Sequence, residues 1–139
     1  MEGRTHLHME IIKAVRDAVG PDYPVSLRLG ACDYMTGGST ISDSVAAAKL
    51  FEAARIDLLS ISGGFCGYSH PTCKEQGYFS EITTEIKTNC SISVLLTGGI
   101  TTAKAAKDLL QHDKADLIGV GRAVLHDSQW AEKAFASLC

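Results

Sequence analysis

The chain has 139 residues, of which 45% are hydrophobic and 21% charged, and its formal net charge at pH 7 is −3. This length and composition suit one globular domain, and the weak negative charge, without a long basic run, argues against nucleic acid or an anionic membrane as a partner. No apolar stretch is long enough to span a membrane and the opening residues lack the apolar core of a secretion signal, so we expect a cytoplasmic protein.

The first part of the chain predicts a helix, a strand and a second helix. Apolar side chains fall on one helical face over residues 7–19, which predicts the first helix. The turn cluster GPDYP ends it, and the apolar run PVSLRLG at 24–30 predicts a strand. The helical spacing of apolar residues over 47–54 predicts the next helix, and Thr40 with Asp43 has the pattern of a capping box ahead of it.

The same alternation continues to the end of the chain. Further strands are predicted at 56–64, 91–99 and 115–121, and further helices at 79–87, 103–110 and 131–138. The strands are short, partly β-branched and nearly continuous in apolar character, which is typical of strands buried on both faces. Such strands joined by helices form parallel sheets.

The order of elements fits two α/β architectures, a four-stranded open sheet or half of an eight-stranded (β/α) TIM barrel. The opening helix favours the barrel, because it has the place of a helix from a preceding unit, whereas open α/β domains more often begin with a strand. Four units cannot close a barrel, since eight are needed to fill one with side chains. We therefore predict that residues 1–139 form a single C-terminal half-barrel, with its first half absent.

Two glycine turns follow the last two predicted strands, at the end where parallel α/β proteins bind ligands. Gly98 and Gly99 precede a predicted helix, and glycine lets backbone N–H groups approach an anion. Gly121 and Arg122 follow the last strand, where the arginine would make a charge-assisted contact. We predict that the two turns share one phosphate. GVGRAV is not a dinucleotide motif, because its third glycine is missing and no helix of the right phase follows at once.

Arg28 is a charged residue inside a predicted buried strand, so it must have a partner or face a ligand. Its place near the strand end favours a ligand, and the alternative is an ion pair with Asp33 or Asp57. Asp57 and Asp116 precede strands at the opposite end, which indicates structural capping.

Five cysteines without a CxxC pair indicate free thiols in a reducing compartment, with a Cys66–Cys73 disulfide as the open alternative. His70 and these two cysteines are metal-ligand types, but their spacing matches no zinc pattern, so no metal is predicted. Tyr68, His70 and Tyr78 are expected to be solvated loop residues rather than to line a pocket.

Four ordered motifs resemble the old yellow enzyme family of NADH:flavin oxidoreductases, which are FMN-containing (β/α) barrels: IIKAVRDAVGPDYPVSLRLG, GGSTISDSVAAAKLFEAARIDLLSISGG, LLTGGI and ADLIGVGRAVLHDSQW. The resemblance covers almost the whole chain and implies barrel units five to eight. It implies that Arg28 reaches the flavin, that Gly98 and Gly99 lie at the FMN phosphate, and that Gly121 and Arg122 hold the same phosphate.

The resemblance implies an FMN-dependent oxidoreductase that passes hydride from NAD(P)H to an activated alkene or similar acceptor. The substrate-anchoring pair and active-site tyrosine of the family belong to the first half of the barrel, so no catalytic residue is expected here. One alternative is a non-catalytic phosphate-binding half-barrel that self-associates. Another is a different FMN or phosphate barrel, similar to dihydroorotate dehydrogenases, although SLRLG and GGST favour the oxidoreductase.

The expected partners follow from the open ends of a half-barrel. Unpaired strand edges invite pairing with another chain, so we expect a homodimer or pairing with an N-terminal half. The competing expectation is a monomer whose first helix folds over the open face. The side chains exposed on that face would be Leu27, Leu29, Ile61 and Val94, or their neighbours of opposite parity.

Overall fold

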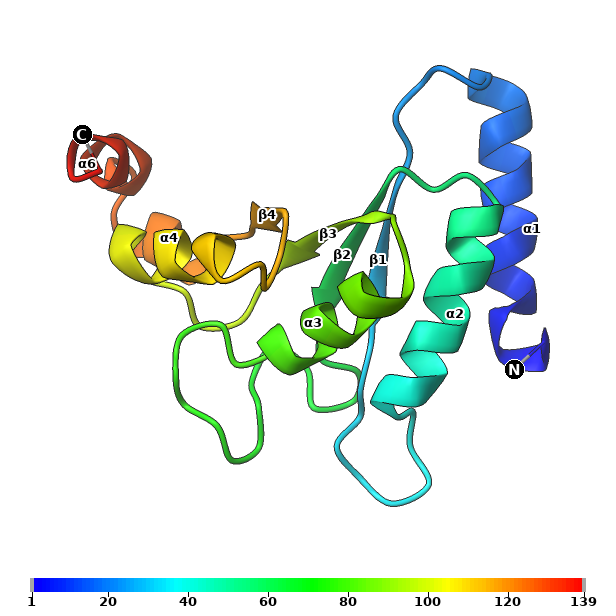
Figure 1. Cartoon of the computed structure of the whole chain (residues 1–139), viewed down its shortest axis with the longest axis horizontal. Helices are drawn as coiled ribbons and strands as arrows, with labels where there is room; N and C mark the ends of the chain where they lie inside the picture. Colours follow the sequence, from blue (N-terminus) through cyan, green and yellow to red (C-terminus); the bar gives the residue numbers. More distant parts are fainter. Residues whose placement is uncertain (1, 139) are drawn as a thin grey trace.

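The computed structural model describes residues 2–138, without the side chain of the first of them, and contains one sheet of four parallel strands in the order β1-β2-β3-β4 (Figure 1). The predicted alternation of helices and strands is confirmed. The elements are α1 (Glu2–Val19), β1 (Ser26–Gly30), α2 (Ile41–Ala53), β2 (Leu58–Ser62), α3 (Ser80–Asn89), β3 (Ser93–Leu96), α4 (Ala103–Gln111), β4 (Leu117–Ile118), α5 (Arg122–His126) and α6 (Trp130–Ala136). No helix among them is long and apolar enough to cross a membrane.

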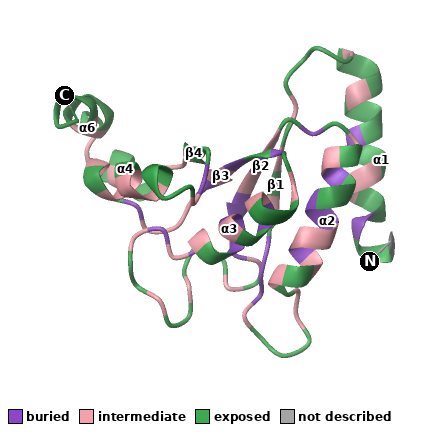
Figure 2. Cartoon of the chain, in the orientation of Figure 1, coloured by how far each residue is buried: buried purple, intermediate pink, exposed green. Residues whose placement is uncertain are grey.

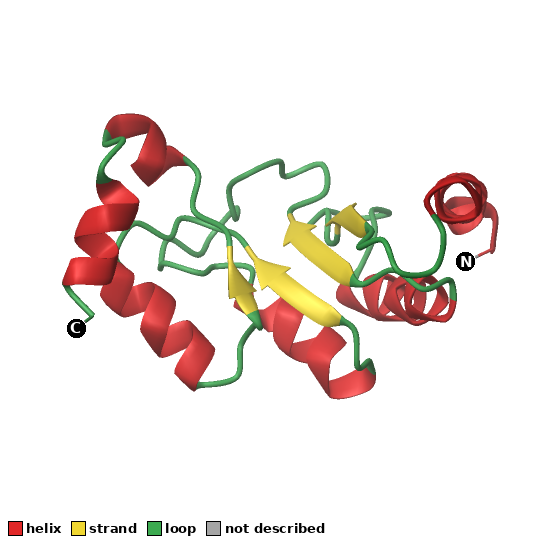
Figure 3. Cartoon of the chain, turned by 90° about the horizontal axis from the view of Figure 1, so that it is seen from above, coloured by secondary structure: helices red, strands yellow, loops and turns green. Residues whose placement is uncertain are grey.

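The core lies between the sheet and the helices packed on one of its faces (Figures 2 and 3). Alternate strand residues are fully buried there, and they form one cluster with Phe51 of α2 and with Ile82 and Ile86 of α3. The buried strand residues are Leu59, Ile61, Val94 and Leu96. In β2 and in β3 the two buried residues are two positions apart, because successive side chains of a strand point to opposite faces of the sheet.

The opposite face of the sheet is open, so the prediction of strands buried on both faces is wrong. Arg28 is exposed on this face. It stands in one row across the sheet with its register partners Ser60, Leu95 and Leu117. The open face therefore carries the residues of opposite parity. It is partly polar, because serines recur along it at 26, 60, 62 and 93.

Helix α1 lies beside α2 rather than over the open face, so the expectation of a folded-over helix is wrong (Figure 1). Its His8 ring lies 5.7 Å from the ring of Phe51, and Ile12 is buried. Leu7 and Ile11 are 64% and 52% exposed. The apolar stripe that predicted this helix is thus mostly uncovered.

The local signals at the strand starts and helix caps are confirmed. Thr40 and Asp43 form the capping box of α2. The Asp57 carboxylate accepts the backbone N–H of Val25 at 2.7 Å, and the Asp116 carboxylate accepts that of Val94 at 2.7 Å. These bonds tie each strand start to its neighbour. They also lower the pKa of Asp57, and the Lys87 ammonium beside Asp116 holds the pKa of that carboxyl below its usual range, against the effect of burial.

The cysteines that the structure describes, Cys32, Cys66, Cys73 and Cys90, are free thiols. The alternative of a Cys66–Cys73 disulfide is therefore wrong. Cys139 lies outside the described residues.

Candidate functional site

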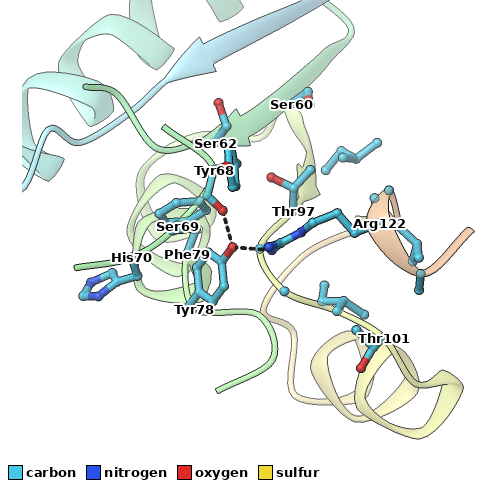
Figure 4. Close-up of a pocket in the computed structure, with 18 of the residues that line it drawn as sticks. Ser60, Ser62, Tyr68, Ser69, His70, Tyr78, Phe79, Thr97, Thr101 and Arg122 are labelled. Atoms are coloured by element: carbon cyan, nitrogen blue, oxygen red, sulfur yellow. Dashed lines mark hydrogen bonds between the residues drawn. The ribbon is translucent and has the colours of Figure 1, made fainter. Parts of the chain in front are cut away.

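A pocket of about 1160 Å³ lies on the open face, at the carboxyl ends of the strands (Figure 4). Its lining includes every residue that the sequence singled out as a site residue: Arg28, Gly98, Gly99, Gly121 and Arg122. These residues come from β1 and from the turns after β3 and β4. The parallel topology brings them together because the carboxyl ends of all four strands lie at one edge of the sheet.

Arg28 projects from the middle of β1 onto this open face. The predicted alternative of an ion pair with Asp33 or Asp57 is wrong, because both carboxylates have other partners. Asp57 pairs with Arg16 at 2.8 Å, and Asp33 accepts the backbone N–H groups of Phe65 and Ser39 at 2.6 Å each. Within residues 2–138, Arg28 has no ion-pair partner, so its charge is available to a ligand.

The Gly98–Gly99 turn needs glycine at both positions. Their φ angles are +128° and +66°, a region that L side chains rarely adopt. A Cβ atom at Gly98 would lie 2.9 Å from the Tyr78 ring, and one at Gly99 would lie 2.5 Å from it. The N–H of Gly77 donates to the carbonyl oxygen of Gly98 at 2.7 Å. The turn is thus in close contact with Gly77 and Tyr78, which come just before α3.

The amino end of α4, which the sequence suggested as part of a phosphate cradle, is already occupied by a side chain. The side-chain amide oxygen of Gln76, Oε1, accepts the backbone N–H groups of Thr101 and Thr102 at 2.6 and 3.0 Å. Thr102 is the N-cap of this helix, and its hydroxyl accepts the N–H of Ala105 at 3.2 Å. Gln76 and Thr102 therefore already accept three of the N–H groups at the start of α4.

Helix α5 begins directly at Arg122, and the sequence did not predict this short helix. Gly121 is the N-cap of this helix, and an added Cβ there would meet no atom within 4 Å. The backbone N–H groups of Gly99, Gly121 and Arg122 donate to no other group in the described part of the chain. They are free to bind an anionic ligand at this end of the pocket.

Two tyrosines of the loop between β2 and α3 hold the Arg122 side chain (Figure 4). The Tyr78 hydroxyl accepts a hydrogen bond from Arg122 Nη2 at 3.0 Å, and the Arg122 guanidinium carbon lies 5.4 Å from the centre of the Tyr68 ring. Both tyrosines line the pocket together with His70, the alternative that the sequence did not favour, and Tyr68 is at the same time 73% exposed. The sequence carries no periodic signal for them, because the loop that presents them is irregular.

His70 is fixed at the far side of the pocket from Arg122. Its Nδ1 accepts the backbone N–H of Cys73 at 2.8 Å, and its side chain is only 11% exposed. Its Nε2 lies 3.7 Å from a carboxylate oxygen of Glu81, which also accepts the Tyr34 hydroxyl at 2.7 Å. Burial and this carboxylate raise the pKa of Tyr34. Across residues 2–138, no three His, Cys, Asp or Glu side chains gather as metal ligands would.

The chain has clear relatives among known enzymes. It is 33% identical over 137 residues to an NADH oxidase of Thermoanaerobacter brockii, covering 96% of this chain and 21% of that protein. It is also 33% identical over 130 residues to an NADPH dehydrogenase of Listeria welshimeri, covering 93% of this chain and 37% of that protein. The chain thus spans well under half the length of these relatives.

Comparison with solved structures supports the same fold. Histamine dehydrogenase from Rhizobium sp. 4-9 superposes with a TM-score of 0.81 at 19% identity, over 98% of this chain and 20% of that one. The family model of the NADH:flavin oxidoreductases and NADH oxidases matches residues 1–138. The chain therefore belongs to the NADH:flavin oxidoreductase / NADH oxidase family, the old yellow enzyme family that its motifs resemble, and it forms part of a TIM barrel.

Proposed function

We propose that this chain supplies the phosphate half of the FMN site in an NAD(P)H-dependent flavin oxidoreductase. One observation carries the proposal. Gly99, Gly121 and Arg122 line one pocket, their backbone N–H groups have no acceptor among the described residues, and the Arg122 side chain is held by Tyr78. Oriented N–H groups with a guanidinium are the donors that bind a phosphate dianion.

The residues present fit FMN in size and in charge. The pocket volume of about 1160 Å³ leaves room for a cofactor of this class. In (β/α) barrels a phosphate is often bound between the last two strand loops and a short extra helix, and α5 follows β4 in that manner. No carboxylate lines the pocket among the described residues, so nothing there would repel the phosphate.

Different residues of the chain would bind different parts of FMN. The glycine turns and Arg122 would fix the phosphate, and Arg28, which lines the same pocket from β1, would place its positive charge against the flavin ring. FMN, when bound, supplies the hydride chemistry between NAD(P)H and an acceptor such as an activated alkene. The protein's contribution here is position and electrostatics.

The four units are proposed to be units five to eight of the barrel, in a cytoplasmic enzyme whose remaining units anchor the substrate. We therefore assign no catalytic residue to residues 1–139. The chain alone, with FMN added, should show no NAD(P)H-dependent reduction of an enone above that of free flavin. Turnover clearly above free flavin would show that this half contains catalytic groups.

The proposed site is tested by calorimetric titration of the purified chain with FMN and with riboflavin, which lacks the phosphate. Arg122→Ala should weaken FMN binding by about tenfold to a hundredfold, since a charge-assisted hydrogen bond is worth about 1.5–3 kcal/mol. Arg28→Ala should weaken both ligands, because it would act at the ring. Lys107→Ala, which removes an exposed charge of α4, serves as the control. Equal FMN affinity in the wild type and Arg122→Ala would contradict the proposal.

A second role, self-association of half-barrels, is favoured by the uncovered apolar residues at both ends of the sheet. Leu7 and Ile11 are exposed on α1, which lies beside α2, and Leu117, Leu125 and Phe135 are 48%, 84% and 72% exposed at or after β4. Burying such surface stabilises association by about 25 cal/mol per Å². A homodimer or an N-terminal half would cover both ends.

Sedimentation equilibrium from micromolar to millimolar concentration separates these outcomes. We expect a dimer that Ile11→Glu weakens and Lys107→Glu does not. A mass of 14.8 kDa throughout the range would exclude the homodimer and leave the N-terminal half as the proposed partner.

A further inference from the structure

The loop between β2 and α3 contributes two tyrosines whose contacts converge on Arg122, and no role for them follows from the motifs. We infer that Tyr78, assisted by Tyr68, is a positioning residue that holds the Arg122 guanidinium toward the phosphate end of the pocket, so that this pair sets the preference for a phosphorylated over a dephosphorylated flavin. The inference rests on the proposed function.

Tyr78 is itself fixed from two sides. Its ring lies against the Gly98–Gly99 turn, closely enough that a Cβ atom at either glycine would overlap it. Its hydroxyl donates to the backbone carbonyl oxygen of Tyr68. Since a carbonyl oxygen only accepts, the single hydroxyl proton is committed there, and the oxygen lone pairs remain for Arg122 Nη2 at 3.0 Å. The direction of both hydrogen bonds is thereby determined.

Arg122 has no other anchor in the described part of the chain. It is exposed on the short helix α5, and no carboxylate pairs with it among residues 2–138. A free arginine side chain samples many rotamers and loses that freedom on binding a ligand. Holding it before the ligand arrives removes part of this cost, as preorganisation does generally.

The second tyrosine holds the guanidinium without using its hydrogen-bond donors. The Tyr68 ring faces the guanidinium carbon at 5.4 Å, within the range of a cation–π contact. Only the Nη2 bond to Tyr78 consumes a donor, so the other guanidinium N–H groups stay available to a phosphate. The backbone carbonyl oxygen of Tyr68 also accepts the hydrogen bond from the Tyr78 hydroxyl, so the two tyrosines that hold Arg122 are linked to each other.

The test uses calorimetric titrations of the purified chain with FMN and with riboflavin. Tyr78→Phe keeps the ring against the glycine turn and removes only the hydroxyl. It should weaken FMN binding by about three- to tenfold, the loss expected for one hydrogen bond, and leave riboflavin binding unchanged. Tyr68→Leu should act in the same direction, whereas Tyr68→Phe keeps the ring and should stay near the wild type. Tyr23→Phe, at an exposed tyrosine of the α1–β1 turn, is the matched control.

A double mutant distinguishes this inference from the proposed function. In an Arg122→Ala background, Tyr78→Phe should have no further effect on FMN, because the group it positions is gone. If Arg122→Ala weakens FMN but Tyr78→Phe changes nothing, or weakens riboflavin equally, the positioning role is wrong and the phosphate site stands. If Arg122→Ala leaves FMN binding unchanged, the proposed function itself fails. Should Tyr78→Phe not fold, Tyr68→Leu tests the same expectation.

Discussion

Asp33 joins the loop between β1 and α2 to the loop between β2 and α3, and its replacement gives the sharpest stability prediction. The residue is 8% exposed, and its two carboxylate oxygens accept the N–H groups of Phe65 and Ser39 at 2.6 Å each. Asp33→Asn keeps the shape but turns one acceptor into a donor that faces a backbone N–H. A hydrogen bond to a charged group is worth about 1.5–3 kcal/mol.

We therefore expect Asp33→Asn to lower the free energy of unfolding by about 2–3 kcal/mol, which corresponds to a fall in Tm of roughly 10 °C for a domain of this size. Thermal unfolding followed by circular dichroism measures this fall in Tm. Asp22→Asn, in the exposed turn after α1, is the control. A loss below about 0.5 kcal/mol, within the usual range for surface substitutions, would refute the reasoning that these two bonds hold the loops.

The same substitution predicts a dependence on pH. The Phe65 and Ser39 N–H groups lower the pKa of Asp33 below its ordinary value of 3.8. The unfolded chain therefore binds this proton more readily, and the stability that the carboxylate contributes is full above the unfolded pKa and is lost as the pH falls through the folded pKa. The difference between the wild type and Asp33→Asn should be constant near neutral pH and shrink below about pH 4. A difference that stays constant into strong acid would contradict this.

Two further substitutions test the walls of the site. Gly99→Ala should cost about 1–2 kcal/mol from its φ of +66° alone and should weaken FMN binding, because its Cβ would lie 2.5 Å from the Tyr78 ring. Gly3→Ala in α1, where nothing lies within 4 Å, should instead be neutral or stabilising by up to about 1 kcal/mol. Trp130→Phe removes the indole N–H bond to the Thr101 carbonyl oxygen at 2.7 Å and should cost about 1 kcal/mol by urea unfolding. An unchanged unfolding midpoint would show that this bond does not hold α6 on the loop after β3.

The positions of the helices and strands were predictable because their signals are local. Apolar patterns located every element except the short helix α5, and the Thr40–Asp43 capping box marked the start of α2. The predicted strand 115–121 shrinks to Leu117–Ile118, the two residues that pair in register with Leu95 and Leu96 of β3. Boundaries depend on pairing, which local sequence does not determine.

The composition of the candidate site was also predictable in part, for a topological reason. Once the strands are parallel, their carboxyl ends share one edge, so Arg28 and the two glycine turns had to come together there. The family motifs agreed with that placement. The phosphate role itself remains a prediction for these residues.

Only the tertiary structure decided which face of the sheet is buried and which loop side chains complete the pocket. The alternation in β1, where Leu27 and Leu29 lie opposite Arg28, was overlooked because each predicted strand was read as one apolar run; in the structure α2 and α3 pack on the apolar face and leave Arg28 and Ser60 open. Gln76 takes the N–H groups at the start of α4, and Tyr78 takes Arg122, through contacts between residues far apart in the chain. An irregular loop has no period from which such contacts can be inferred, so they appear only when the chain is folded.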